Sequence, residues 1–219
     1  MRLILTALPA ARHAISWPML ASAFMLASAA SVAHADLAYT FDAGLENFRL
    51  NDPAAGALSW QAQGHLRVQD LTDATNVQLL LPETDLRNWA AFQGGTLSFD
   101  ARLESPISSY WPEFGAVTLL SLGGNASVDL VPANEPGTAW KTYTLKLDGA
   151  TFGKSEAAFA ETLAGLQEVQ INLEAGNGAI ETVLIDNVRV TAVPEPATWA
   201  LGLVGLAGVV GATRRPFKR

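Results

Sequence analysis

The sequence contains no cysteine, and only 16% of its 219 residues are charged. Without a thiol, the chain cannot form a disulfide framework, a cysteine nucleophile, or a thiolate site for zinc or an iron–sulfur cluster. Positive charge is scarcest in the middle, because residues 36–193 hold 20 acidic side chains but only 8 Lys and Arg. An acidic surface repels phosphate, which argues against nucleic acid as a partner.

Motifs of the common catalytic classes are also lacking. The sequence has no Gly-x-Ser-x-Gly, no His-Glu-x-x-His and no phosphate-binding glycine loop. His65 is the only histidine between residues 36 and 193, and we expect it to be a surface residue. A glycan-active hydrolase would need two facing carboxylates, and no spacing singles out such a pair. We therefore predict no catalytic residue, no cofactor and a protein that is not an enzyme.

The first 35 residues have the layout of an export signal. Two arginines precede an apolar run over residues 19–30, and Ala33 and Ala35 then place small side chains two positions apart. Signal peptidase recognises this order, so we expect a signal peptide over 1–35 that is cleaved after Ala35. A retained N-terminal anchor is the alternative.

The C-terminus begins with a proline-flanked acid. Pro194 and Pro196 fix their own φ angles and lack N–H donors, and they enclose Glu195. Each proline also disfavours helix for the residue before it. We therefore expect residues 194–196 to be extended and accessible to a processing enzyme, with Glu195 as the one charge to recognise.

An uncharged segment and a basic tail follow. Residues 197–213 carry no charge, and Arg214 and Arg215 open a basic tail over 214–219. At helical rise the segment is just long enough to cross a bilayer, so we predict a single transmembrane helix. The basic tail should stay cytoplasmic, which leaves the acidic middle outside. A buried globular helix is the weaker alternative, because no face of the segment is polar.

Together, these C-terminal features over residues 193–219 resemble a PEP-CTERM sorting signal. The resemblance implies processing by an exosortase, a membrane-embedded enzyme, in a Gram-negative bacterium that makes extracellular polysaccharide. The protein would be exported across the inner membrane, held briefly by its C-terminal helix, and then placed at the cell surface or in the extracellular matrix. Residues 36–192 would form the ectodomain between the two signals.

Residues 36–192 alternate apolar and polar side chains with the period of a half-buried strand. In the clearest case Leu97, Phe99, Ala101 and Leu103 fall on one face. Gly176-Asn177-Gly178 predicts a tight hairpin turn, because its central positions tolerate positive φ. Nine strands are predicted, over 37–41, 65–71, 77–81, 96–103, 116–122, 127–131, 142–147, 168–174 and 182–190.

Only two stretches depart from this pattern. Ser155 can cap a helix over 155–166, where several alanines favour helix. Residues 86–92 are expected to form a helical turn or a loop. Many antiparallel strands with so little helix predict an all-β fold, an antiparallel two-sheet jelly-roll sandwich with one short helix.

Three segments of the middle carry a second resemblance. The sequences YTFDAGLENF at 39–48, WKTYTL at 140–145 and IDNVRV at 185–190 resemble a laminin-type or galactose-binding-like jelly roll. Folds of this kind often serve as carbohydrate-binding modules. The resemblance therefore implies a sandwich, and it makes carbohydrate one expected partner.

Asp186 falls in phase with the apolar residues Leu184 and Val188, so its carboxylate is expected to point toward a packed face. An unpaired buried carboxylate is costly. Hydrogen bonds and a basic partner could compensate the Asp186 carboxylate, or a bulge could turn it outward. The third possibility is a structural calcium ion shared with Asp42, because similar jelly rolls hold such an ion between their first and last strands.

Aromatic side chains are the candidate carbohydrate contacts, because sugar faces stack on such rings. Tyr110 and Trp111 lie in an expected loop and are the first choice, with Trp60 and Trp89 as secondary candidates. Trp140, at the head of a regular strand, is expected in the core. For each ring, packing in the core or at its edge is the alternative.

The leading hypothesis is an exported, exosortase-sorted surface or extracellular-matrix protein, associated with exopolysaccharide or biofilm. A carbohydrate-binding module with an aromatic platform is the first alternative. A glycan-active hydrolase is the second.

Overall fold

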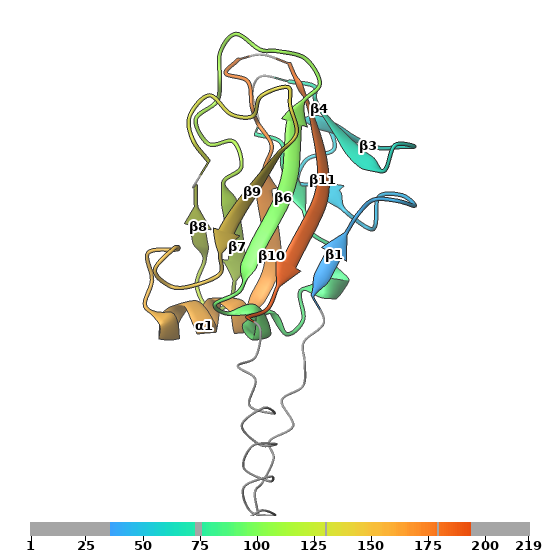
Figure 1. The fold of residues 1–219 in the computed structure, drawn as a ribbon. Coiled ribbons are helices and arrows are strands. Elements are labelled where there is room, and N and C mark those ends of the chain that lie inside the picture. The colour runs from blue at the N-terminus through green and yellow to red at the C-terminus, as the bar shows by residue number, and fades with distance from the viewer. Residues whose placement is uncertain (1–35, 73–75, 130, 179, 194–219) are drawn as a thin grey trace, which may run out of the picture. The chain divides into compact units, whose positions relative to one another are not determined.

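Two antiparallel β-sheets face each other in a computed structural model that describes residues 36–72, 76–129, 131–178 and 180–193 (Figure 1). The expected fold, mostly β with two antiparallel sheets and one α-helix, is confirmed for these residues. The predicted signal peptide, the PEP tripeptide and the predicted transmembrane helix lie outside the described residues. Within them, no helix is both long and apolar enough to cross a bilayer.

Strand β11 lies at the centre of the first sheet, which we call the β11 sheet. It pairs with β6 along one edge, and with β4 and then β1 along the other. The sheet order is β3-β4-β11-β6-β9, with β1 added beside β11. The bounds are β1 Leu37–Tyr39, β3 Gly56–Gln61, β4 His65–Asp70, β6 Thr96–Leu103, β9 Lys141–Lys146 and β11 Thr182–Thr191.

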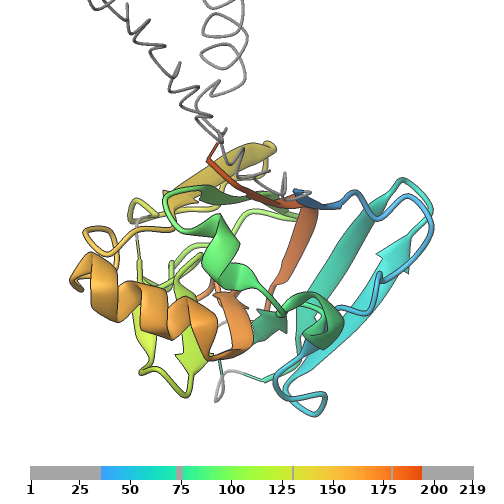
Figure 2. The same cartoon turned by 90° about the horizontal axis from the view of Figure 1, so that it is seen from below.

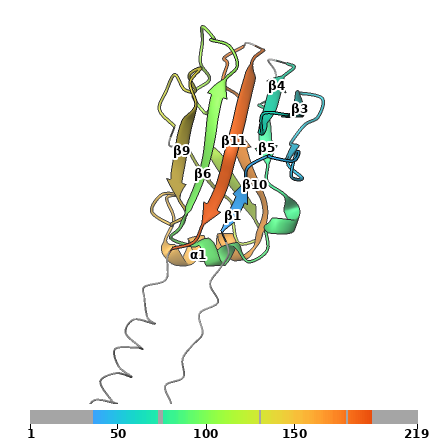
Figure 3. The same cartoon turned by 45° about the vertical axis from the view of Figure 1, so that its right-hand side comes forward.

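The second sheet, which we call the β10 sheet, lies behind the first in Figure 3 and has the order β2-β5-β10-β7-β8. Its central strand β10 pairs with β5 on one side and β7 on the other. The bounds are β2 Arg49–Leu50, β5 Gln78–Leu80, β7 Val117–Ser121, β8 Ala126–Val128 and β10 Leu166–Asn172.

Helix α1 (Glu156–Ala164) lies at one end of the sandwich, next to η2 (Trp89–Phe92), as Figure 2 shows. The Ser155 hydroxyl accepts a hydrogen bond from the backbone N–H of Ala158, so the predicted cap is confirmed. The stretch expected as a helical turn or loop holds the 3-10 helix η2, and η1 (Glu83–Asp85) precedes it.

The core forms where the inward faces of the two sheets meet. Strand β6 alternates strictly, with Leu97, Phe99, Ala101 and Leu103 buried as predicted. All nine predicted strands have a counterpart among β1 and β4–β11. Trp89, a secondary candidate for ligand contact, is completely buried and donates its indole N–H to the Asp85 carbonyl.

Two expectations are wrong, and two strands were not predicted. Residues 176–178 do not close a hairpin, because β10 and β11, on either side of them, belong to different sheets. Trp140 is 44% exposed rather than buried, since it precedes the edge strand β9. Strands β2 and β3 were not predicted, because β2 has only two residues and β3 lacks a regular alternation of buried and exposed positions.

The described chain enters and leaves the sandwich at adjacent points. Leu37 of β1 is the register partner of Val190 of β11. The Asp36 carboxylate also accepts a hydrogen bond from the backbone N–H of Ala192, at 3.1 Å. Both ends therefore lie at the end of the sandwich that carries α1, and β11 begins at the opposite end.

Candidate functional site

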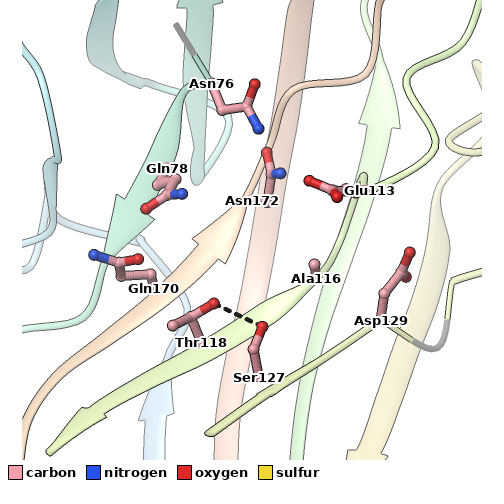
Figure 4. A pocket seen from close by; sticks show the side chains of 9 residues that line it. All are labelled: Asn76, Gln78, Glu113, Ala116, Thr118, Ser127, Asp129, Gln170 and Asn172. Atoms are coloured by element: carbon pink, nitrogen blue, oxygen red, sulfur yellow. Dashed lines mark hydrogen bonds between the residues drawn. The ribbon is translucent and has the colours of Figure 1, made fainter. Parts of the chain in front are cut away.

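A polar groove crosses the outer face of the β10 sheet (Figure 4). Its cavity volume is about 180 Å³. The strands β5, β10 and β7 place alternate side chains on this face, while their apolar neighbours Leu79, Ile171 and Leu119 are buried in the core. The groove is lined by Asn76, Gln78, Glu113, Ala116, Thr118, Ser127, Asp129, Gln170 and Asn172.

The lining offers amide, hydroxyl and carboxylate groups but no aromatic ring and no cation. Figure 4 shows Gln78 and Gln170 on one side of the groove and Glu113 and Asp129 on the other. The Thr118 and Ser127 hydroxyls are joined by a hydrogen bond of 2.9 Å across β7 and β8. Such a surface can exchange hydrogen bonds with a hydroxyl-rich ligand, and its lining has no cationic side chain to pair with an anion.

Tyr110 and Trp111 border the groove region without lining it. The Trp111 backbone N–H donates to the Ala175 carbonyl at 2.8 Å, and Tyr110 forms an isolated β-bridge with Gly176. Tyr110 packs against the hydrophobic core, and the Trp111 indole N–H is buried without an acceptor among the described residues. These contacts attach the loop to the segment that follows β10. Ligand binding by the two rings stays a prediction.

The exposed aromatic side chains lie on and beside the β11 sheet. Trp140 is flanked by Arg102, whose guanidinium carbon is 5.2 Å from the ring centroid, and by His65 at 5.7 Å between ring centroids. Trp60 is 38% exposed and donates its indole N–H to the Phe41 carbonyl. His65 is partly exposed, and partial burial lowers its pKa.

A bulge resolves the question of Asp186. The register of β11 against β6 shifts between Asp186 and Arg189, and Asn187 adopts a φ of 49°. Asp186 is thereby partly exposed and accepts the Asn187 backbone N–H at 2.6 Å. Partial burial and the nearby Asp100 raise the pKa of Asp186, against the opposing effect of that hydrogen bond. Asp42 is exposed, and its carboxylate accepts the Thr40 hydroxyl.

The described residues contain one set of acids placed as metal ligands. Asp70, Glu174 and Glu181 each offer a carboxylate oxygen, and these oxygens lie within 4.8 Å of one another. All three residues are buried. No local sequence pattern singles out this cluster, although Asp70 falls in phase with the buried Leu66 and Val68, which places an acid at an inward position.

The groove was also missed, although its signal was present. Gln170 and Asn172 alternate with the buried Val169 and Ile171, so period-two reasoning places them together on an outer face. What the sequence does not give is strand order. Only the pairing of β10 with β5 and β7 brings these amides beside Gln78 and Thr118.

A protein-sorting motif occupies the end of the sequence. Residues 192–219 match the PEP-CTERM protein-sorting motif. The match includes Pro194, Glu195, Pro196 and the basic tail, so the resemblance stated from the sequence is confirmed. No curated protein matches the chain in sequence.

The fold is similar to that of a laminin domain. The L4b domain of human laminin alpha-2 superposes with a TM-score of 0.54 at 15% identity, over 72% of this chain and 98% of that domain. An exo-beta-agarase gives a TM-score of 0.49 at 15% identity, over 71% of this chain and 24% of the agarase. The CBM22-1 xylan-binding domain of Paenibacillus barcinonensis Xyn10C gives 0.46 at 14% identity, over 75% and 100%. The laminin similarity confirms the expected architecture; it does not extend to a ligand.

Proposed function

We propose that this chain is an exported, non-enzymatic protein that an exosortase sorts through its C-terminal motif in a Gram-negative bacterium. The β-sandwich would then be displayed at the cell surface or in the extracellular matrix, in contact with exopolysaccharide. The PEP-CTERM match over residues 192–219 is the observation that carries this proposal.

The position of the motif along the chain supports the proposal. Strand β11 ends at Thr191, and the tripeptide begins at Pro194. Cleavage near Glu195 would therefore leave every strand of the sandwich in the mature protein. Processing at the N-terminus, after Ala35, would likewise leave β1 complete, since it starts at Leu37.

The sorting proposal is tested with Glu195→Ala in the producing bacterium. We expect the variant to accumulate in the inner membrane at its unprocessed mass, while wild type is recovered from the surface or medium, beginning at Asp36 and lacking the basic tail. Glu161→Ala, which changes an exposed acid of α1, is the matched control and should be processed normally. Normal release of the Glu195 variant would contradict the proposal.

The groove favours carbohydrate binding as a second candidate function. Its lining of four amides, two hydroxyls and two carboxylates is suited to hydrogen-bond the hydroxyls of a polysaccharide. Because no ring lies in the lining, binding there would rest on hydrogen bonds rather than on stacking. The Tyr110 and Trp111 site predicted from the sequence would rest on stacking instead.

Two variants separate these sites. Gln170→Ala removes an amide from the groove floor, and Trp111→Ala removes a ring outside it. If the groove binds the producer's exopolysaccharide, Gln170→Ala should weaken binding about tenfold, because one hydrogen bond to a neutral partner is lost. Trp111→Ala should leave the binding affinity unchanged. The opposite result would assign binding to the aromatic site. No binding by wild type would leave a structural role.

Hydrolysis is the third function to test. Glycosidases place two carboxylates on opposite sides of the scissile bond. Glu113 and Asp129 both line the groove, but they lie on the same side of it in Figure 4. We therefore expect no release of reducing sugar from the producer's polymer, and release that is lost in Glu113→Gln would overturn the non-enzymatic assignment.

A further inference from the structure

Three carboxylates meet inside the sandwich, at the end opposite α1. Asp70 is the last residue of β4, Glu174 follows β10 by two residues, and Glu181 precedes β11. They are only 3%, 5% and 6% exposed, respectively. Their ligand oxygens lie within 4.8 Å of one another. Burying three acids together is unfavourable unless something compensates their charge.

Backbone donors account for part of this compensation. One Glu181 oxygen, Oε1, accepts the N–H groups of Ala175 and Gly176 at 2.7 and 2.9 Å. The Glu174 carboxylate accepts the Val77 N–H at 3.4 Å. The second Glu181 oxygen, Oε2, is buried and has no hydrogen-bond partner among the described residues. That oxygen is the acceptor for which the described fold provides no donor.

No basic side chain of the described residues forms a salt bridge with Glu174 or Glu181. Among the described residues, the Glu174 and Glu181 carboxylates therefore have backbone N–H groups as their hydrogen-bond donors.

We propose that Asp70, Glu174 and Glu181 bind a calcium ion. The ligand set consists of oxygens only, which hard divalent cations prefer. Calcium–oxygen distances of about 2.3–2.6 Å allow two ligands of one ion to be separated by up to about 4.6–5.2 Å. The carboxylate oxygens of the three acids lie within 4.8 Å of one another, which is compatible with that range. The ion would give Glu181 Oε2 the partner that it lacks.

The ion would join the two sheets. Asp70 and Glu181 belong to adjacent strands of the β11 sheet, where the Asp70 N–H donates to the Glu181 carbonyl. Glu174 extends from β10, and its N–H donates to the side-chain oxygen of Asn172 in the groove floor. Calcium would therefore fix the end of the groove to the opposite sheet. This site is separate from the Asp42 and Asp186 pair considered from the sequence.

The test is a thermal melt and a calcium titration of the purified full-length chain in detergent. At a calcium concentration about 100 times Kd, we expect the wild-type Tm to rise by roughly 5–10 °C over that in chelator. Calorimetry should give one calcium per chain. Magnesium at the same concentration should have a clearly smaller effect, and an equal effect would contradict the choice of calcium.

Glu181→Gln is the diagnostic variant. Its amide oxygen can keep the bonds from Ala175 and Gly176, while its NH₂ group replaces Oε2 and can donate to the other two carboxylates. We expect Tm in chelator at or above that of wild type, affinity reduced at least tenfold, and a rise in Tm with calcium no more than about half that of wild type. If this variant fails to fold, Glu174→Gln serves the same purpose.

Two controls keep the result specific. Glu161→Gln, on the exposed face of α1, and Asp186→Asn, at the bulge, should both retain the full calcium response. A wild-type chain that neither gains Tm nor binds calcium would overturn the proposal, and the cluster would then share protons instead. Loss of the response in Asp186→Asn with retention in Glu181→Gln would also overturn it.

Discussion

At the scale of single residues, two of the three tyrosines donate hydrogen bonds from their phenols to carboxylates. The Tyr39 hydroxyl donates to Asp85 at 2.8 Å, and the Tyr143 hydroxyl donates to Glu135 at 2.9 Å. Both rings pack in the core beside phenylalanines. Burial, followed by the hydrogen bond to a carboxylate, raises the pKa of both phenols well above the usual value.

This pKa shift predicts a loss of stability in alkali. The folded state keeps the two phenols protonated above pH about 10, where phenols of the unfolded chain ionise, so unfolding releases protons. The free energy of unfolding is therefore unaffected by these groups below pH 10 and falls as the pH rises above it. Urea unfolding at pH 9 to 11 measures this, and the double variant Tyr39→Phe/Tyr143→Phe should show a shallower fall.

Absorbance provides the check on that interpretation. At pH 11, the tyrosinate signal of the folded chain should lack the contribution of two of its three phenols, and unfolding in urea should restore it. Complete ionisation in the folded protein near pH 10 would be incompatible with buried, hydrogen-bonded phenols.

At the scale of elements, helix α1 depends on a cap that the sequence already indicates. Ser155 has extended backbone angles, its hydroxyl accepts the Ala158 N–H at 3.2 Å, and Glu156 occupies the first turn. Phe159 and Leu163 of the same helix are buried in the core. The cap therefore positions a helix that closes one end of the sandwich.

We expect Ser155→Ala to lower the free energy of unfolding by about 1 kcal/mol, because an N–H at the start of the helix loses its acceptor. Ser155→Asp, whose carboxylate can cap and also favours the positive end of the helix dipole, should lower it little or not at all. Urea unfolding at neutral pH compares the three proteins. Equal losses in both variants would show that the cap contributes nothing.

Elements that bury one face were predictable, and those defined by long-range pairing were not. The alternation in β6 and β10 comes directly from burial on one side, so period-two reasoning identifies both strands. Edge strand β3 has three exposed residues among six and shows no such alternation. The loop at 176–178 has the composition of a tight turn, but its conformation follows from its passage between the sheets.

The candidate sites follow the same division. The amides of the groove were visible as outward positions, but their assembly depends on a strand order that no local pattern contains. The three clustered acids come from separate strand ends, 104 and 7 residues apart along the chain. Sequence reasoning directed attention to Asp42 and Asp186, which sit in recognisable motifs, whereas burial distinguishes Asp70, Glu174 and Glu181.

At the scale of the whole molecule, one core joins the two sheets, so a cavity in either sheet should weaken both. Ile171 of β10 is fully buried, opposite Leu79 and Val117. Ile171→Ala should cost about 2–5 kcal/mol and Ile171→Val about 0.5–1.5 kcal/mol, because the cavity grows with the volume removed. Urea unfolding should remain a single transition with an unchanged slope, and two separate transitions would show that the sheets unfold independently.

Strand β11 also determines how the molecule would respond to tension. A pull applied beyond Ala192 enters the fold along the axis of β11, which is hydrogen-bonded along both edges by β6, β4 and β1. Ladder bonds lie across the strand direction, so the pull loads many of them in shear at once instead of opening them one by one. A chain tethered by its C-terminal end would thus transmit drag from its surroundings through the longest strand of the sandwich.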